Sequence, residues 1–451
     1  IKITPADGLI TGLSFVNSDL FAKEKTKTAI MHYDYMVLAG TQGINNHKKL
    51  DRMIDVIRGL KVPLIFFCEG GGGRPGDVDA GDQNIAGLNI PSFHDFARLS
   101  GEVPLVGIGS GRLFAGNAAL LGCCDVIIGT RDLNLGMGGP AMIEGGGLGV
   151  YKPEEVGPAS VQYPNGVIDI LVDNEDDAIV IAKKYLSYFQ GNLGSWEAPE
   201  VENLRYVIPE NRLEVYDIRE VIDNIADIGS VLEIKAGFAK GMFTGFIRVK
   251  GKPLGLIANN PLFLAGAIDS NGADKASRFI KLCENYNIPI LSLCDTPGMM
   301  VGPEIEETGL VRHCCRLFLA GANVTVPMMT IVLRKAYGLG AQAMAGGSFM
   351  APQFVVGWPT AEIGAMGLEG AVKLGYRKEL EAESDVEKKE KLFKKLVDEL
   401  YEKGKAINAA SLLEFDTVLD PIESRDWISM VAESPIDSSE KVPKNRYIDS
   451  W

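Results

Sequence analysis

The groups best suited to chemistry in this chain are backbone amides at a glycine turn, rather than reactive side chains. Val326 to Leu333 is a short uncharged apolar run, which is typical of a buried strand. Arg334 to Gly340 then supplies a turn with two glycines, and Ala341 to Met344 are good helix formers. A strand that enters a helix this way leaves several N–H groups free, and these can stabilise an oxyanion. The same pattern also fits a tight turn that binds no ligand.

The turn occurs twice, and the repeat favours a function. Val103 to Ala119 matches Val326 to Gln342 at an offset of 223 (326 − 103), from the Val-Pro opening into the helix. Upstream, Val62 to Gly70 matches Ile288 to Thr296, since in each a proline leads an apolar strand, a Cys, an acidic residue and a loop. A duplicated fold is the simplest account of both matches. Two such halves can place two oxyanion-binding turns across one cleft.

Length and composition predict a globular protein of two domains. A chain of 451 residues suits two domains of about 200 residues each. We place the boundary in the Pro- and Gly-containing stretch 191–212, which gives an N-terminal domain 1–205 and a C-terminal domain 206–451. The formal net charge of −14 argues against nucleic acid as a main partner, although local basic patches stay possible.

Cysteine and histidine usage argues against disulfides and metals. The seven cysteines show neither a disulfide framework nor a zinc-ribbon spacing, which predicts a reducing, cytosolic setting. The four histidines lack metal-ligand spacing, so we expect no metal site. No apolar run reaches membrane-spanning length and no signal peptide is visible, so no membrane association is expected. The first residue is Ile1, which suggests a fragment or a trimmed chain.

The elements that must position the two turns alternate between strand and helix. Residues 7–27 are expected to be irregular, and the glycine-rich stretch 136–149 is expected to be a loop that either approaches substrate or is mobile. The alternation indicates an α/β protein, with either a doubly wound sheet or a spiral ββα arrangement. Strands are expected at 27–40, 62–68, 103–109, 125–129, 167–172, 231–235, 242–250, 254–259, 289–294 and 326–333, and helices at 48–60, 90–99, 175–189, 215–228, 273–286, 310–320 and, as a charged pair, 377–408.

Several motifs together resemble the carboxyltransferase (β-type) component of biotin-dependent acyl-CoA carboxylases, a family of the crotonase-like superfamily. The second half contains LIANNPLFLAGAIDSNGADKASRFIKLC, CDTPGMMVGPEIEETGLVRH, RKAYGLGAQAM and VGWPTAEIGAMGLEGAV. The first half contains YDYMVLAGTQG, CEGGGGRPGD, FAGNAAL and GPASVQYPNGVIDILV. The resemblance covers nearly the whole chain and implies an α/β protein with two tandem crotonase-like (ββα spiral) domains.

The resemblance implies that a carboxyl group moves from carboxybiotin to the α carbon of an acyl-CoA, which could be acetyl-CoA, propionyl-CoA or longer. The first domain would hold the acyl-CoA and the second the carboxybiotin, at a site between different subunits. The amides of Ala115 and Gly116 would polarise the thioester carbonyl, and those of Leu339 and Gly340 would stabilise the biotin oxygen. The internal repeat alone instead pairs Ala115 and Gly116 with Gly338 and Leu339. Further substrate-binding residues are expected to be Gly71, Gly72, Gly73, Arg74, Tyr337, Gly338 and Gln342, the last bearing on acyl-chain choice.

The resemblance also implies partners. No biotin-attachment motif and no ATP-binding part is visible, so biotin carboxylase and the biotin carboxyl carrier would be other subunits or domains. A homo-oligomer is expected, namely a hexamer built as a trimer of dimers, in the cytoplasm or, in a eukaryote, the mitochondrial matrix. Two alternatives stay open: an acyl-CoA decarboxylase or lyase that uses the same two oxyanion sites, and a non-catalytic scaffold subunit that binds CoA esters.

The remaining polar side chains each have two interpretations. The acidic residues that end the matching strands could anchor loops or do acid–base work, and the histidine after Arg312 could pack or transfer a proton. The basic residues near the turns could contact a CoA phosphate or a nearby carboxylate, and the cysteines are expected to be small buried side chains rather than nucleophiles. The residues concerned are Glu69, Asp295, His313, Arg74, Arg334 and Lys335.

Overall fold

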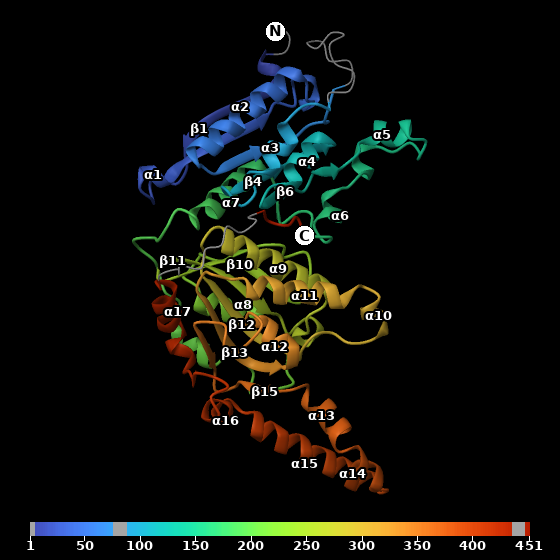
Figure 1. Ribbon diagram of the computed structural model, residues 1–451, viewed down its shortest axis with the longest axis vertical. Coiled ribbons are helices and arrows are strands. Elements are labelled where there is room, and N and C mark those ends of the chain that lie inside the picture. The colour runs from blue at the N-terminus through green and yellow to red at the C-terminus, as the bar shows by residue number, and fades with distance from the viewer. Residues whose placement is uncertain (1–4, 75–87, 435–446) are drawn as a thin grey trace. The chain divides into compact units, whose positions relative to one another are not determined.

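The computed structural model describes residues 5–74, 88–434 and 447–451 (Figure 1). Its contacts divide the described chain into two compact units. The first contains 5–74, 88–194, Ile234–Phe238 and 447–451, and the second contains 195–233 and 239–434. Each unit combines a mainly parallel sheet with helices, so the expected α/β class is confirmed. We keep the division at 205/206 as a proposal for the two functional halves.

The first unit is built on a six-stranded sheet with the order β1-β2-β3-β4-β6-β8, and β5 and β7 form a separate two-stranded sheet. Only the β1–β2 pair is antiparallel. Apolar side chains of α2, α3 and α4 pack with the sheet into one core, because they recur at helical spacing on one face of each helix. The elements are η1 (Pro5–Gly8), β1 (Leu9–Phe15), α1 (Lys23–Thr26), β2 (Lys27–Tyr33), η2 (Leu38–Gly40), α2 (Ile44–Leu60), β3 (Leu64–Phe67), α3 (Ser92–Ala97), β4 (Leu105–Gly109), β5 (Arg112–Phe114), α4 (Gly116–Gly122), β6 (Val126–Thr130), β7 (Asn134–Gly136), α5 (Pro140–Gly145), η4 (Pro153–Glu155), α6 (Ala159–Gln162), β8 (Ile170–Val172) and α7 (Glu175–Ser187).

The second unit is built on a sheet with the order β16-β14-β13-β12-β11-β10-β9, and β15 pairs with the far end of β13. A second apolar core lies between this sheet, α8 and α17. Apart from a helical extension described below, the elements of this unit are η5 (Val201–Arg205), α8 (Ile218–Ile225), β9 (Leu232–Glu233), β10 (Met242–Val249), β11 (Lys252–Asn259), η6 (Leu264–Gly266), α9 (Ser270–Asn285), β12 (Ile290–Thr296), α10 (Pro303–Glu306), α11 (Leu310–Ala322), β13 (Met328–Tyr337), α12 (Gly338–Met344), β14 (Phe354–Gly357), β15 (Glu362–Gly364), β16 (Thr417–Val418), η7 (Pro421–Glu423) and α17 (Ser424–Ala432).

A helical extension follows β15 in the second unit (Figure 1). It has a small apolar core of its own, which contains Leu368, Leu380 and Leu396. Tyr337, the last residue of β13, also belongs to this core, so the extension is attached directly beside the turn. The extension consists of α13 (Leu368–Gly375), α14 (Arg377–Ala382), α15 (Val386–Gly404) and α16 (Ala406–Ser411).

The duplication is visible in strand pairing. In the first unit β5 pairs with β7 so that Phe114 lies opposite Gly136, and in the second unit the end of β13 pairs with β15 so that Tyr337 lies opposite Gly364. The two Leu-Ala-Gly turns, η2 and η6, also make the same close approach. A Cβ on Gly40 would lie 2.5 Å from the carbonyl oxygen of Glu69, and one on Gly266 would lie 2.2 Å from that of Asp295. Both glycines have positive φ, so no side chain fits at either position.

Three local expectations are wrong. Arg334 to Tyr337 continue strand β13 instead of forming a turn, because β15 pairs with them, and the helix begins directly at Gly338. The stretch 7–27, expected to be irregular, contains β1, in which only Leu9 is buried, so no buried face marks it as a strand. The glycine-rich stretch 136–149, expected to be a loop, contains α5, which starts with Pro140 at its first position and continues with good helix formers.

Candidate active site

The first turn joins β5 to α4 through Ala115, which has a φ of 52°. The N–H of Ala115 donates to the carbonyl oxygen of Gly136 at 3.1 Å, so this amide is already used by the small sheet. Helix α4 begins at Gly116, and the first amides of a helix have no partner within it. The structure therefore offers the amide of Gly116, rather than that of Ala115, as the more available donor of the expected pair.

The glycine loop after β3 packs directly on this turn. A Cβ on Gly72 would lie 2.5 Å from the Cβ of Ala115 and 2.9 Å from the nitrogen of Gly116. Gly72 is buried, while its neighbours Gly71 and Gly73 are exposed. Of the three glycines expected to bind substrate, Gly72 thus fixes the turn, and Gly71 and Gly73 face outward beside it.

Asn117 ties the loop to the turn, and the sequence analysis missed it. Its side chain is fully buried, its Oδ1 accepts from the N–H of Gly72 at 3.0 Å, and its Nδ2 donates to the carbonyl oxygen of Cys68 at 3.2 Å. A buried asparagine that meets both loop and strand leaves little freedom to either. An asparagine in the first turn of a helix, where it is a poor helix former, was the available signal.

Gln42 closes the other side of the turn. Its backbone N–H donates to the carbonyl oxygen of Gly72 at 2.7 Å, and its Nε2 donates to the hydroxyl of Tyr33 at 3.1 Å. A Cβ on Gly116 would lie 2.3 Å from the Oε1 of Gln42, so a larger residue at this position would displace the Gln42 side chain. Burial raises the pKa of Tyr33, and this hydroxyl therefore stays protonated and donates onward to Asn46 at 3.2 Å.

Arg74 lies at the end of the glycine loop and is held by the protein itself. Its guanidinium contacts the buried carboxylate of Asp7 at 2.5 Å and the hydroxyl of Thr41 at 3.1 Å. The sequence left open whether Arg74 pairs with a CoA phosphate or with a nearby carboxylate, and in this structure it pairs with the carboxylate of Asp7.

The second turn joins β13 to α12 through Gly338, which has a φ of 55°. A Cβ on Gly338 would lie 2.9 Å from the carbonyl oxygen of Ala365, and one on Gly340 would lie 2.7 Å from the backbone of Gly298. Gly298 is held by Thr296, whose hydroxyl both accepts from its N–H and donates to its carbonyl oxygen at 3.1 Å. Leu339, between them, is 62% exposed. In both units a glycine loop therefore packs against a turn that opens a short helix.

A cavity of about 750 Å³ lies beside the second turn. Gly338 and Gln342, two of the residues expected to bind substrate, contact it, and most of its other walls are apolar. Its volume is within the range of small-molecule sites. The extension contributes one wall, because Leu400 of α15 and Ala409 of α16 line the cavity with Met350 and Met366.

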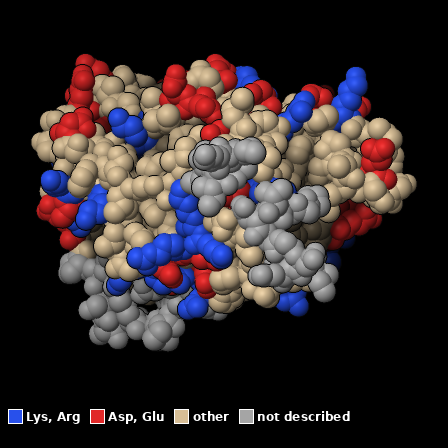
Figure 2. All heavy atoms as spheres, turned by 90° about the horizontal axis from the view of Figure 1, so that it is seen from above, with Lys and Arg blue, Asp and Glu red and all other residues tan. Residues whose placement is uncertain are grey.

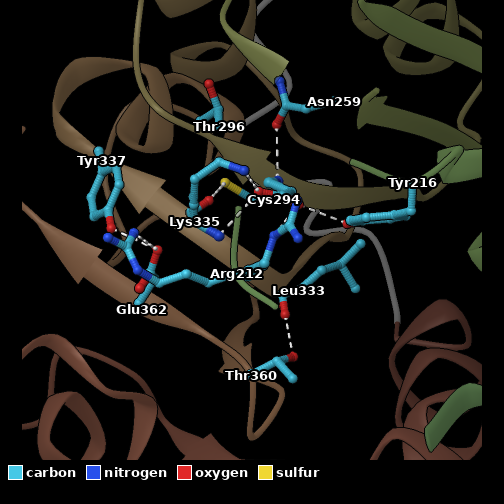
Figure 3. Close-up of polar contacts among 12 residues, drawn as sticks. Arg212, Tyr216, Asn259, Cys294, Thr296, Leu333, Lys335, Tyr337, Thr360 and Glu362 are labelled. Atoms are coloured by element: carbon cyan, nitrogen blue, oxygen red, sulfur yellow. Dashed lines mark hydrogen bonds and ion pairs between the residues drawn. The ribbon is translucent and has the colours of Figure 1, made fainter. Parts of the chain in front are cut away.

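The buried carboxylate of Asp295, near the end of β12, has several donors. Two of its partners, Tyr216 and Lys335, are labelled in Figure 3. The carboxylate of Asp295 accepts from the hydroxyl of Tyr216 at 2.8 Å, contacts the guanidinium of Arg334 at 3.1 Å and the ammonium of Lys335 at 2.9 Å. Burial, together with the negative charge of Asp295, raises the pKa of Tyr216 and of the Cys294 thiol. Asp295 thus anchors β13, and both cations are paired with it rather than free for a phosphate.

The other reactive side chains are also held in structural contacts. His313 Nδ1 lies 2.7 Å from the carboxylate of Asp274, which agrees with a hydrogen-bonding role. Burial raises the pKa of Cys68 and Cys124, which makes them poor nucleophiles. Burial also raises the pKa of Glu69, which lies against Gly111. Within the described ranges there is no group of three or more His, Cys, Asp or Glu that could hold a metal ion.

Surface charge is mixed in spite of the net charge of −14. The face shown in Figure 2 carries a gathering of Lys and Arg side chains near its centre, with acidic side chains both among them and around the periphery. A local basic surface on an acidic protein is compatible with a phosphorylated ligand. Among the helices that the structure describes, none is long and apolar enough to cross a membrane.

Sequence comparison gives a consistent set of relatives. A family model described as the carboxyl transferase domain matches residues 24–447. The methylmalonyl-CoA carboxyltransferase 12S subunit of Propionibacterium freudenreichii subsp. shermanii is 32% identical over 446 residues, which cover 96% of this chain and 81% of that subunit. A propionyl-CoA carboxylase beta chain of Saccharopolyspora erythraea is 30% identical and is matched over 98% of this chain and 82% of its own length.

Solved structures confirm the expected tandem fold. A single-chain, multi-domain long-chain acyl-CoA carboxylase superposes with a TM-score of 0.90 at 53% identity, over 95% of this chain. The chain spans 42% of the length of that enzyme. The transcarboxylase 12S hexamer core, solved with methylmalonyl-CoA and methylmalonic acid bound, superposes with a TM-score of 0.81 at 30% identity, over 95% of this chain and 81% of its own.

Proposed function

The chain belongs to the carboxyl transferase domain family, and from this premise we propose that it transfers a carboxyl group from carboxybiotin to the α carbon of an acyl-CoA. The observation that carries the proposal is the repeated turn. Each unit presents a sharp strand-to-helix turn, fixed by a glycine loop, at which amide N–H groups lie together. Such donors suit a reaction in which negative charge develops on two oxygens in succession.

The first turn would hold the thioester oxygen of the acyl-CoA. Gly116 would donate its amide, and Ala115 would contribute only if it released Gly136. Strand pairing aligns Phe114 with Tyr337, so Gly116 corresponds to Leu339 and Asn117 to Gly340. This register favours the amides of Gly116 and Asn117 as the first pair of donors. The exposed Gly71 and Gly73, with Arg74 behind them, would border the coenzyme.

The second turn would hold the ureido oxygen of carboxybiotin through the amides of Leu339 and Gly340. The residues present fit that group, because a cavity of about 750 Å³ with apolar walls adjoins Gly338 and Gln342. Carboxybiotin, when bound, supplies the carboxyl group and then the base that removes the α proton. The chain's own amides would stabilise charge on both oxygens, each donor contributing roughly 3 kcal/mol to the transition state in comparable sites. No side-chain acid or base is required.

A long acyl chain is the substrate class that the comparisons support best. The structure at 53% identity is that of a long-chain acyl-CoA carboxylase, while the relatives named for propionyl-CoA are about 30% identical. Gln342, on the cavity wall, would bear on this choice. The proposed partners are biotin carboxylase and a biotin carboxyl carrier, as domains or subunits, and the proposed assembly is a homo-hexamer built as a trimer of dimers, like the hexameric 12S core.

The proposal is tested by biotin-dependent decarboxylation. The chain would be given malonyl-CoA, methylmalonyl-CoA and longer 2-carboxyacyl-CoA esters, each with and without free biotin. Turnover that requires biotin and rises with chain length supports the proposal. Turnover that ignores biotin would instead establish an acyl-CoA decarboxylase, and binding of the esters without turnover would establish a scaffold subunit.

A further inference from the structure

A second polar cluster surrounds the hydroxyl of Tyr337, the residue before the turn, and the proposed reaction does not use it. The hydroxyl of Tyr337 donates to Oε1 of Glu362 at 2.7 Å. The guanidinium of Arg212 lies 3.8 Å from the same oxygen and 2.6 Å from the carboxylate of Glu369. Figure 3 shows Tyr337, Glu362 and Arg212 turned toward one another. Four segments of the second unit therefore meet beside the turn: the chain before α8, the end of β13, β15 and α13.

The cluster is costly to maintain. Glu362 is 1% exposed, and its Oε2 has no hydrogen-bond partner among the residues that the structure describes. Burial raises the pKa of Glu362, although the bond from Tyr337 and the charge of Arg212 act in the opposite direction. A buried carboxylate with an unmet oxygen requires an explanation beyond packing.

The fold does not need this cluster, because the first unit lacks it. The residue that pairs at the position of Glu362 is Asn134, since Arg112 lies opposite Asn134 as Lys335 lies opposite Glu362. The residue at the position of Tyr337 is Phe114. The same small strand pair and the same turn thus form with an apolar ring and an amide. The tyrosine and the carboxylate are specific to the second turn.

We propose that Glu362 and Arg212 are positioning residues that act through Tyr337 to fix the backbone from Gly338 to Gly340. This inference rests on the proposed function, because it assigns the cluster to the amides that would hold the ureido oxygen. Tyr337 directly precedes Gly338, and Gly338 packs so closely on Ala365 that an added Cβ would lie 2.9 Å from the carbonyl oxygen of Ala365. The phenol ring of Tyr337 is held both at its apolar body and at its hydroxyl. The peptide between Tyr337 and Gly338 is therefore held in one orientation.

The ring is held at both ends. Its apolar body is buried in the core of the helical extension with Leu368 and Val372, and its hydroxyl is tied to Glu362. The guanidinium of Arg212 lies beside the carboxylate of Glu362 and also binds the carboxylate of Glu369 at the start of α13. The extension, which forms one wall of the cavity, and the turn, which forms another, are thereby tied to the same side chain.

The test compares Tyr337→Phe, Glu362→Ala and Glu362→Gln in biotin-dependent decarboxylation. Tyr337→Phe and Glu362→Ala are expected to lower kcat roughly ten-fold, the size of one hydrogen bond to a charged group, with KM for the CoA ester nearly unchanged. Glu362→Gln keeps an acceptor for the tyrosine and is expected to restore most of kcat. The double variant Tyr337→Phe/Glu362→Ala should be no slower than either single variant, because both remove the same bond.

Tyr376→Phe is the matched control, because Tyr376 packs on the same apolar core. It should leave kcat unchanged. Amide hydrogen exchange over β15 and the end of β13 is the second readout and does not depend on turnover. Faster exchange in Tyr337→Phe than in Tyr376→Phe is expected.

Two results would overturn the assignment. One is a normal kcat in both Tyr337→Phe and Glu362→Ala, even if their melting temperatures fall. The other is unchanged exchange in Tyr337→Phe. If the unmodified chain shows no biotin-dependent turnover, the proposed function fails, and exchange alone then decides whether the cluster holds the turn.

Discussion

Replacing Gly72 by alanine should damage the first turn far more than the same change one residue later. Gly72 is buried with a φ of +81°, and an added Cβ would lie 2.5 Å from the Cβ of Ala115 and 2.9 Å from the nitrogen of Gly116. Neither atom belongs to a flexible side-chain end, so the turn or the loop must move. Gly73 has no atom within 4 Å of the same added group.

The size of the effect follows from two contributions. A non-glycine residue at this φ costs about 1–2 kcal/mol, and overpacking a well-filled site costs about 1–3 kcal/mol. Gly72→Ala should therefore lower the unfolding free energy of the first unit by about 2–5 kcal/mol. If the amide of Gly116 binds the thioester oxygen, its displacement should also lower kcat by about 10²- to 10³-fold, as the loss of one oxyanion donor does elsewhere.

The assay pairs chemical denaturation with biotin-dependent decarboxylation of a malonyl-CoA series. Gly73→Ala, the control for packing, should change the unfolding free energy by less than about 0.5 kcal/mol and leave kcat within about two-fold. Only kcat is compared between the two variants, and not KM, because Gly73 would border the coenzyme. Equal behaviour of the two variants would refute the reasoning, because it would mean that the contact between Gly72 and the turn is not maintained in solution. A large loss of stability in Gly72→Ala with a normal kcat would separate the fold argument from the catalytic one and refute only the latter.

Three further outcomes are expected. Gly340→Ala, whose Cβ would lie 2.7 Å from the backbone of Gly298, should lower kcat at least ten-fold in the same assay. Asn117→Ala should lower the unfolding free energy, measured in urea, by about 2–4 kcal/mol, because it leaves the buried N–H of Gly72 unpaired. The raised pKa of Glu362 means that the folded state holds this proton more tightly than the unfolded state, so its contribution to stability is present below the ordinary value of 4.5 and is lost as the pH rises through the raised pKa. Glu362→Gln should remove that loss, so its melting temperature should gain on that of the unmodified chain as the pH rises above 4.5; a difference that is constant with pH would contradict this.

The sequence predicted the parts of the fold that are local and repeated. The helices around Leu50 and Phe279 follow from apolar spacing on one face, and the paired strands ending at Cys68 and Cys294 follow from the internal match. The extent of β13 could not be predicted, because its last residues are strand only by pairing with β15, some 25 residues later, in a register of Lys335 opposite Glu362. Local periodicity carries no information about such a partner.

The two glycine turns of the candidate site could be predicted from the sequence, but the side chains that hold these turns could not. Glycines in a turn are visible in sequence because their conformational freedom is a residue property. What holds them is not visible. Asn117 and Gln42 look like ordinary helix and loop residues, and become anchors only because three segments of the first unit converge on them.

The two turns are supported by different chemistry, and this difference bears on how they would work. The first is touched by neutral side chains, with Gln42, Tyr33 and Asn46 in one chain of hydrogen bonds, and this chain ends at the carboxylate of Asp7, which accepts from the N–H of Asn46 at 2.9 Å. The second is backed by the carboxylates of Asp295 and Glu362, which are matched by nearby cations.

The side chains that touch the first turn directly, Gln42 and Asn117, are neutral, so the first turn should depend on pH less than the second turn does. The second turn rests in part on Glu362, whose carboxyl accepts the hydrogen bond of Tyr337 and whose pKa is raised by burial. A duplicated scaffold can therefore carry two oxyanion-binding turns with different pH dependence. The acyl and biotin half-steps of the proposed reaction should accordingly separate in their pH profiles, with the pH-sensitive step assigned to the second unit. Identical profiles for ester binding and for biotin-dependent turnover would show that the charged support does not control the second turn.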